Sequence, residues 1–307
     1  MMGSMCQPLF YVAQNVIGLQ LEGKVDLSKV EGVRWCYSKV HFAEVRRSQT
    51  PEKYLDVLEA LDAALLDIAM AQFRPTGDVI LVETGRPKEH FARFLDAVEE
   101  VPFDMSIIDA LQAWWNGSNE VELIRQLPER WSSQLESICE RLPPDLRRQI
   151  MESPGADISA LVQRIISQGS DIEKTRAAFG GGKGRLGDIK GDGHLMQIWE
   201  IVRQSCGDMT SDEFFGFAPS RGTHERKPLF LGIGNCCAVL EMLGYKAERK
   251  GRRTEKIPNV RSDAEHIAMG AYCSAMMSAD RRLVERAQAI FEYKNIGTTL
   301  FLVEVTD

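Results

Sequence analysis

The sequence has no apolar run of about 18 residues, the minimum length of a helix that crosses a bilayer. Its first residues contain no basic segment followed by a long apolar stretch, so we expect no signal peptide. The expectation is therefore a cytoplasmic protein with no membrane segment. Positive charge is also scarce, because the net charge is −7. Such a chain has no overall attraction to nucleic acid, so any nucleic-acid contact must come from a local basic cluster.

Cysteines and histidines with metal-site spacing are absent as well. The seven cysteines are scattered, only Cys236 and Cys237 are neighbours, and the number is odd. This usage is typical of reduced cytosolic thiols. The five histidines do not group into a zinc-binding set. No internal repeat occurs, and 307 residues with 44% hydrophobic content allow one large domain or two ordinary ones, each with a real core.

Apolar segments at the two ends of the sequence alternate with helical patterns. Strands are predicted at 9–13 and 33–38, and in the segments AMMSA and TTLFLVEV near the end. The segment DVILVE, 78–83, is a further strand candidate. A helix is predicted from Pro51 to about Gln72, because apolar residues from Tyr54 to Ile68 recur at helical spacing. Strands that alternate with helices indicate an α/β fold whose parallel sheet is covered on both faces.

The domain organisation follows from this distribution. Residues 1–75 and 227–307 are expected to form one α/β core, and residues 76–226 an inserted, mostly helical subdomain. Within the insertion, residues 179–194 contain seven glycines and predict a mobile loop. The GKGRLG segment in this loop is no dinucleotide fingerprint, because no strand precedes it and no helix opens directly after it.

Three acidic residues stand near predicted element ends, and each has an ordinary explanation. Glu44 lies on the helix after the second strand and reads alone as a surface glutamate. Asp263 opens the segment SDAEHIAMGAYC, where Ser262 and Glu265 form a capping-box pattern at a predicted helix start. Asp280 follows the AMMSA strand, where it suits either a helix cap or a ligand site at the carboxyl end of a parallel strand.

Two other features are weighed in the same way. His266 lies one turn after Asp263 and is expected to be a packed or capping histidine. The segment 246–256, KAERKGRRTEK, holds six basic and two acidic residues. It is either a solvated loop or, against the negative net charge, a contact for phosphates.

Taken together, these segments resemble a PIN-like nuclease domain. That family opens with an apolar strand followed by Asp-x-Asn, and this sequence has the frame FYV-Ala13-Gln14-Asn15. The family's early helical Glu is matched by Glu44 in HFAEV. Its late helix with an Asp is matched by SDAEHIAMGAYC, and its strand–Ser–x–Asp–helix run by AMMSADRRLVERA, with Ser278 and Asp280. The resemblance covers the two ends, about half of the chain.

The resemblance implies a three-layer PIN-like fold and a metal site. In such domains the acidic residues converge at the carboxyl edge of the sheet and bind Mg²⁺ or Mn²⁺. Here Glu44, Asp263 and Asp280 would bind the metal, and Asn15 and Ser278 would orient these ligands. The substrate backbone would contact basic residues, which are Arg46, Arg47, Arg249, Lys250, Arg252 and Arg253.

Ala13 stands where the family has its first Asp. One explanation is an engineered Asp→Ala change that inactivates a nuclease. The MMGSM start, which looks like a scar of expression cloning, favours this explanation. The other is a natural pseudo-nuclease that keeps the fold and has lost its metal. In both cases the resemblance implies an impaired enzyme, because one ligand and one charge are missing.

Two functions from different classes follow. The first is a metal-dependent endonuclease, preferably acting on RNA rather than DNA, of the toxin or anti-phage effector type. A homo-oligomer and a protein partner such as an antitoxin are expected with it. The second is a non-catalytic binding or regulatory subunit that docks a partner through its helical middle, where Trp114, Trp115 and Trp131 would form a contact area.

Overall fold

The computed structural model describes residues 7–71, 74–82, 84–100, 110, 121–140, 142–153, 157–168, 186, 189, 191–219, 227–247 and 257–305. The described chain divides into two compact units. The first consists of Met1–Phe94, Phe179–Ala247 and Arg261–Asp307, and the second of Leu95–Ala178 and Glu248–Val260. Residues 76–94 and 179–226, which the sequence analysis assigned to the insertion, thus belong to the first unit.

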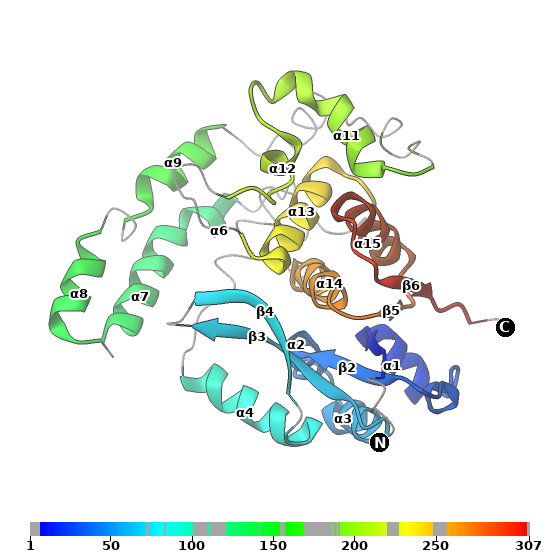
Figure 1. The fold of residues 1–307 in the computed structure, drawn as a ribbon. Helices are drawn as coiled ribbons and strands as arrows, with labels where there is room; N and C mark the ends of the chain where they lie inside the picture. Colours follow the sequence, from blue (N-terminus) through cyan, green and yellow to red (C-terminus); the bar gives the residue numbers. More distant parts are fainter. Residues whose placement is uncertain are drawn as a thin grey trace. The chain divides into compact units, whose positions relative to one another are not determined.

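A six-stranded sheet in the order β4-β3-β2-β1-β5-β6 organises the first unit (Figure 1). The strands are β1 (Leu9–Val12), β2 (Arg34–Ser38), β3 (Ala64–Ala71), β4 (Arg74–Val82), β5 (Ala275–Ser278) and β6 (Thr299–Leu302). All neighbours pair in parallel except β3 and β4, which are antiparallel. The predicted mixed α/β fold with a mostly parallel central sheet is confirmed.

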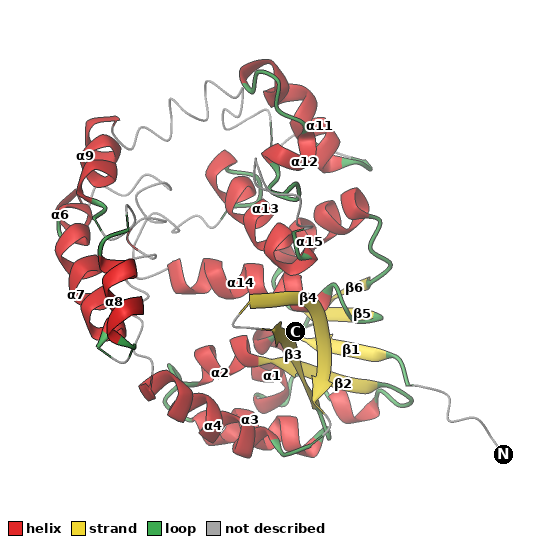
Figure 2. Ribbon diagram, turned by 60° about the vertical axis from the view of Figure 1, so that its left-hand side comes forward, coloured by secondary structure: helices red, strands yellow, loops and turns green. Residues whose placement is uncertain are grey.

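Helices cover both faces of the sheet, as Figure 2 shows. One face packs against α1 (Gln14–Leu21), α2 (Lys39–Val45), α3 (Pro51–Ala60) and α4 (Pro87–Glu100), and we call it the α1–α4 face. The other packs against α11 (His194–Val202), α13 (Leu229–Leu243), α14 (Ile257–Gly270) and α15 (Arg281–Lys294), and we call it the α13–α15 face. Shorter elements are η1 (Leu27–Lys29), η2 (Arg203–Ser205) and α12 (Ser211–Phe214).

Successive side chains of a strand point to opposite faces of the sheet, so each central strand contributes to both cores. On β1, Tyr11 packs in the core of the α13–α15 face and Val12 in the core of the α1–α4 face. On β2, Cys36 belongs to the first core and Tyr37 to the second. All four side chains are fully buried. The central strands are therefore apolar on both sides, which is why they read as continuous hydrophobic runs.

The helix predicted from Pro51 to Gln72 is wrong beyond Ala60. The chain turns at Asp62, whose φ of 47° is left-handed and cannot continue an α-helix. Residues 64–71 then form β3, which pairs with β2 on one side and with β4 on the other. Two neighbours supply backbone hydrogen bonds for this apolar segment, so tertiary pairing overrides its helical spacing.

The described part of the second unit includes α6 (Val121–Arg125), α7 (Leu127–Cys139), α8 (Pro144–Met151) and α9 (Ser159–Gln168). A small core of Ala110, Ile124, Leu127 and Val162 joins α6, α7 and α9, whereas α8 has no buried residue. Trp131 packs against this core, whereas Trp114 and Trp115 lie outside the described residues. Most of the predicted mobile loop 179–194 also lies outside them.

Candidate functional site at the carboxyl edge of the sheet

Three parallel strands, β2, β1 and β5, end at one edge of the sheet. The chain continues from β1 to β2 on one side, while β5 lies on the other side of β1, so the direction of the connections reverses between β1 and β5. In open α/β sheets, ligands bind outside the carboxyl ends of strands at this reversal. Ala13 lies there, directly after β1, and its N–H donates to Met277 O at 2.9 Å. The Ala13 side chain is buried.

Asn15 and Ser278 join the two strand ends. The Asn15 Nδ2 donates to Ser278 Oγ at 3.1 Å, and Asn15 Oδ1 accepts from the N–H of Ala279 at 2.9 Å. Ser278 Oγ in turn accepts from the N–H of Asp280 at 3.1 Å. Two residues that lie 263 positions apart therefore fix the geometry of this edge.

Asp280 caps helix α15. Its Oδ1 accepts from the N–H groups of Arg282 at 2.8 Å and Leu283 at 3.3 Å. Asp280 Oδ2 lies 3.5 Å from the Arg282 guanidinium. The helix-cap role considered for Asp280 is thus observed. Asp280 lies two residues after Ser278, the last residue of β5.

Glu44 lies on α2 and is partly buried, with 19% of its side chain exposed. Its Oε2 lies 3.1 Å from His266 Nε2 on α14. Burial raises the pKa of the Glu44 carboxyl, but the hydrogen bonds and charge of His266 and the hydrogen bond from Ser262 outweigh it, and the net pKa is lowered. The carboxylate is therefore held in its ionised form by two side chains of α14.

Asp263 is not at a helix start. Helix α14 begins at Ile257, six residues earlier, so the capping box predicted from Ser262 and Glu265 does not form. Pro258 in the first turn suits this earlier start, because proline has no N–H to leave unpaired there. Asp263 instead forms an ion pair at 2.9 Å with Arg286 of α15. Its side chain faces the other helices of this face rather than capping its own.

Arg286 is the most deeply buried charged side chain near this edge, at 2% exposure. Besides Asp263, it pairs with Glu241 of α13 at 3.3 Å, and Glu241 is 3% exposed. Arg286 was not among the predicted site residues. Its sequence position indicates a buried ion pair, because Arg286 falls within the apolar stripe of Leu283, Ala287 and Ile290, where a charge needs a buried partner.

The three acidic residues interact electrostatically although they come from distant parts of the chain. The pKa of Asp263 is raised to about 6: burial is the main cause, the charges of Asp280 and Glu44 add to it, and Arg286 and His266 oppose it. A carboxylate responds in this way to like charges only when they lie close by. The folded chain thus brings Glu44, Asp263 and Asp280 into one electrostatic neighbourhood at the carboxyl edge.

These side chains do not complete a metal site in the described part of the chain. No group of three or more His, Cys, Asp or Glu side chains there is arranged to hold a metal ion. Ala13 supplies no oxygen, and Asp263 already has the Arg286 guanidinium beside it. The donor type, carboxylate oxygen, fits Mg²⁺ or Mn²⁺, but the arrangement does not fit as the chain stands.

The predicted substrate-contacting residues divide into two groups. Arg46 and Arg47 are exposed directly after α2, the helix that carries Glu44. Arg249, Lys250, Arg252 and Arg253 lie outside the described residues. The two arginines next to Glu44 therefore supply positive charge on the chain segment that leaves the site.

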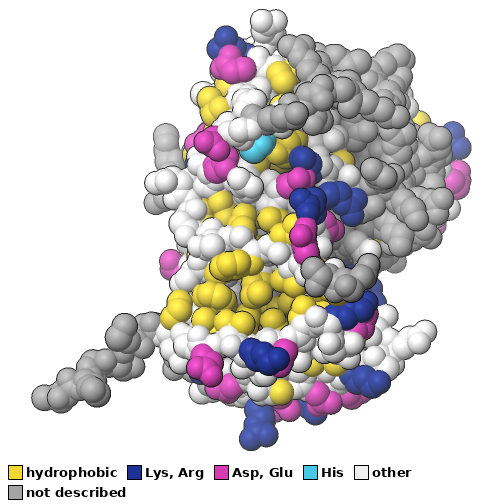
Figure 3. All heavy atoms as spheres, turned by 90° about the vertical axis from the view of Figure 1, so that its right-hand side faces the viewer, with side chains coloured by type: hydrophobic (Ala, Val, Ile, Leu, Met, Phe, Trp, Pro, Cys, Tyr) yellow, Lys and Arg dark blue, Asp and Glu magenta, His cyan; other side chains and the backbone are white. Residues whose placement is uncertain are grey.

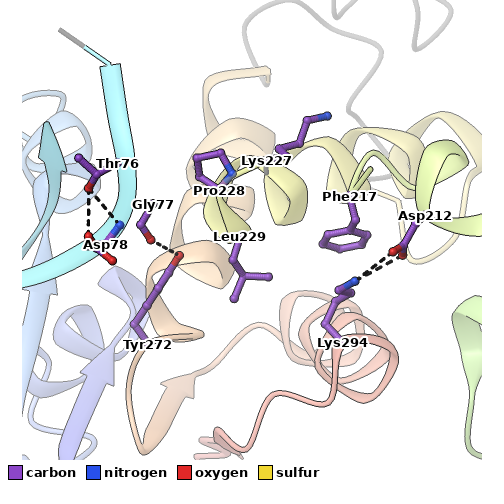
Figure 4. Close-up of a pocket in the computed structure, with 10 residues that line it drawn as sticks. All are labelled: Thr76, Gly77, Asp78, Asp212, Phe217, Lys227, Pro228, Leu229, Tyr272 and Lys294. Carbon is purple, nitrogen blue, oxygen red and sulfur yellow. Dashed lines mark hydrogen bonds and ion pairs between the residues drawn. The ribbon is translucent and has the colours of Figure 1, made fainter. Parts of the chain in front are cut away.

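A pocket of about 550 Å³ lies elsewhere in the first unit (Figure 4). It is lined by Thr76, Gly77, Asp78, Asp212, Phe217, Lys227, Pro228, Leu229, Tyr272 and Lys294. Tyr272 and Lys294 precede β5 and β6, so the pocket lies toward the amino ends of these strands. Lys294 pairs with Asp212 at 3.4 Å, and the two lysines balance the two aspartates. The charges that line the pocket therefore favour neither an anionic nor a cationic ligand.

Strand β6 forms one edge of the sheet and carries exposed apolar side chains. Phe301 is 42% exposed and stacks on Phe10 with ring centroids 6.2 Å apart. Val305, three residues after β6 ends, is 40% exposed. Figure 3 views the side of the molecule where β6 lies in Figure 1, and hydrophobic side chains gather there in a continuous area.

Comparison with known proteins gives no match: no protein-family model, curated protein or solved structure is similar to this chain. The fold defines the class as a mixed α/β protein with a six-stranded, mostly parallel sheet. Among its described helices, none has the length and apolar character required to cross a membrane. The functional assignment therefore depends on the side chains at the carboxyl edge.

Proposed function

We propose that the protein is a PIN-like, metal-dependent phosphodiester hydrolase, an endoribonuclease in preference to a DNA nuclease, in a form impaired at Ala13. One observation carries the proposal. Glu44, Asp263 and Asp280 come from three separate segments and interact electrostatically at the carboxyl edge, where the strand connections reverse. Like-charged groups gather at a cost unless a cation compensates them, so their proximity favours a cation-dependent function.

The roles follow from the positions of the residues. Glu44, Asp263 and Asp280, with a carboxylate at position 13, would bind Mg²⁺ or Mn²⁺, which would activate water and stabilise charge on the phosphate. Asn15 and Ser278 hold the ends of β1 and β5 in register. Arg46 and Arg47 would contact the phosphate backbone, together with Arg249, Lys250, Arg252 and Arg253. The preference for RNA rests on the resemblance alone, as do a toxin or anti-phage role, a homo-oligomer and an antitoxin-type partner.

The second candidate is a non-catalytic binding or regulatory subunit. The buried Arg286 favours it, because its guanidinium already compensates Asp263 and Glu241. An ion pair that neutralises the site internally removes the need for a metal. The buried methyl group of Ala13 agrees with this candidate as well. A natural loss of the carboxylate fits this candidate, whereas an engineered Asp→Ala change fits the nuclease.

The test compares this chain with its Ala13→Asp and Ala13→Asn variants by Mn²⁺ calorimetry and by cleavage of RNA and DNA. Asparagine matches aspartate in shape without the charge, so it controls for the effect of a larger side chain. The nuclease proposal expects a Mn²⁺ site in Ala13→Asp, none in Ala13→Asn, and loss of the site when Asp263→Asn is added. An Ala13→Asp protein that binds no Mn²⁺ and cuts no nucleic acid would leave the binding subunit as the function.

A further inference from the structure

A chain of buried hydrogen bonds leads from the core of the α13–α15 face to Glu44. Ser38 Oγ lies 2.7 Å from the hydroxyl of Tyr11, and this hydroxyl lies 2.9 Å from His266 Nδ1. His266 Nε2 lies 3.1 Å from Glu44 Oε2. Tyr11 is completely buried, and Ser38 and His266 are each 2% exposed. The chain therefore runs through the interior and reaches solvent only at the Glu44 carboxylate.

With Glu44 ionised and the His266 imidazole neutral, one set of donors and acceptors satisfies every bond in this chain. An ionised Glu44 can only accept, so His266 Nε2–H donates to it. In the neutral imidazole, Nδ1 then accepts, so the hydroxyl of Tyr11 donates to it. Burial raises the pKa of Tyr11 well above its ordinary value, so this hydroxyl keeps its proton. The Tyr11 oxygen accepts in turn from the Ser38 hydroxyl.

His266 Nε2 lies 3.1 Å from Glu44 Oε2, and this is the hydrogen bond whose geometry orients the carboxylate. Ser262 lies four residues before His266, on the same side of α14, and is buried. Its side chain adds to the lowering of the Glu44 pKa. The orientation of the Glu44 carboxylate therefore depends on His266.

We propose that His266 is a positioning residue, and that the Ser38–Tyr11–His266 chain fixes the orientation of the Glu44 carboxylate. Glu44 accepts from Nε2–H and Tyr11 donates to Nδ1, so both partners favour the tautomer in which Nε2 carries the proton. The consequence for metal binding rests on the proposed function, because it requires Glu44 to be a ligand. The positioning itself is a property of the chain as it stands. Groups that orient ligands in this way affect metal affinity by about 10- to 100-fold when they are removed.

The protein contains a matched control on the opposite face. The Tyr37 hydroxyl lies 2.8 Å from His90 Nδ1, and His90 Nε2 lies 2.8 Å from the backbone oxygen of Thr84. This tyrosine is also completely buried, and His90 is 6% exposed. Both pairs join a tyrosine hydroxyl to a histidine Nδ1, but His90 Nε2 contacts a backbone carbonyl, whereas His266 Nε2 contacts an acidic side chain. A Tyr37→Phe change therefore removes an equivalent hydrogen bond without touching Glu44.

The first arm of the experiment uses the chain without metal. Histidine ¹⁵N signals report the tautomer of His266, and the ¹³C signal of the Glu44 carboxyl reports its environment. In Tyr11→Phe we expect a mixed tautomer at His266 and a displaced Glu44 signal. In Tyr37→Phe both signals are expected to stay in place. A Tyr11→Phe protein with unchanged His266 and Glu44 signals would overturn the proposal, and so would equal changes in the two variants.

The second arm adds the same changes to the Ala13→Asp protein and measures Mn²⁺ affinity. We expect Tyr11→Phe to weaken it by about tenfold, the low end of the range for such groups, and Tyr37→Phe to leave it within about twofold. His266→Gln retains an N–H donor and should keep more affinity than His266→Leu. If His266→Leu does not fold, the two tyrosine variants still decide. Failure of Ala13→Asp to bind Mn²⁺ would count against the nuclease function alone, because the first arm judges the positioning independently.

Discussion

The two faces of the sheet bury different kinds of polar side chains beneath their helices. The α13–α15 face buries Arg286 with Glu241 and Asp263, and its His266 pairs with Glu44 of α2. The core of the α1–α4 face contains the Tyr37–His90 pair, which ends on a backbone carbonyl. Buried charges are costly, and proteins retain them where they serve a function or a specific structure. The buried cluster of Arg286 thus lies on the α13–α15 face, whereas the candidate site also takes Glu44 and Asn15 from helices of the α1–α4 face.

Among the described residues, each face has a cation with two carboxylate partners, and the two clusters differ in burial. On α15, Arg286 is 2% exposed beside Asp263 and Glu241. On α4, Lys88 is 47% exposed and lies 2.5 Å from Asp56 and 3.7 Å from Glu59. Because solvent screens the exposed cluster, we expect it to contribute less to stability than the buried one. Mutating the two clusters would measure this difference.

The largest effect is expected from Arg286→Met. Methionine fills a similar volume but leaves Asp263 and Glu241 without their cation, so we expect the free energy of unfolding to fall by about 3–5 kcal/mol. Urea unfolding at neutral pH measures this change. A loss below about 1 kcal/mol would show that the two carboxylates take up protons or water with little penalty, and the contrast between the faces would disappear.

An intermediate effect is expected at His41, which bridges the ends of β1 and β2. Its Nε2 lies 2.7 Å from Val12 O, and its Nδ1 accepts from the Ser38 N–H at 3.1 Å. The pKa of His41 is lowered to about 3: burial is the main cause and the nearby His266 adds to it, while hydrogen bonding to Val12 and Ser38 and the Glu44 charge oppose the shift. The imidazole therefore stays neutral in the folded protein at acidic pH.

The sign of the pH effect follows from proton uptake. Between about pH 6.5 and pH 3, the unfolded chain protonates His41 and the folded chain does not. The unfolded state binds more protons, so stability falls as the pH is lowered through this window, by up to about 1.4 kcal/mol per pH unit. Urea unfolding from pH 7 to pH 4 should show a flatter slope in His41→Gln. Equal slopes would mean that His41 is protonated in the folded protein.

The smallest effect is expected from Lys88→Met, the exposed counterpart of Arg286→Met. Water replaces the lost ion pairs on α4, so no measurable change in the urea midpoint is expected at physiological salt. A substantial destabilisation here would show that the number of partners, and not their burial, decides the strength of such clusters.

The strands β1, β2, β5 and β6 could be predicted because their short apolar segments are bounded by polar or turn residues. Strand β3 could not, because the ALLDIAMA segment has apolar residues at both helical and strand spacing. Only its pairing with β2 and β4 decides between the two. The start of α14 was misplaced for a related reason: Ser262 and Glu265 have capping-box spacing, but Pro258 opens the helix earlier.

The candidate site shows the same division. The resemblance predicted Glu44, Asp263 and Asp280 as ligands, with Asn15 and Ser278 to orient them. The partners of these residues could not be read from the sequence, because His266 lies 222 positions from Glu44 and Arg286 lies 23 positions from Asp263 on a different helix. Local patterns describe single elements, whereas the pairing of buried polar groups depends on how the elements pack.

The position of β1 at the centre of the sheet has a consequence for biosynthesis. Asn15 needs Ser278 as its hydrogen-bond partner, and 263 residues separate the two. At ribosomal rates of about 5–20 residues per second, roughly 13–50 s pass between their translation. A nascent or truncated chain therefore has no assembled carboxyl edge, whatever this edge binds. The completed edge forms only after translation has passed β5.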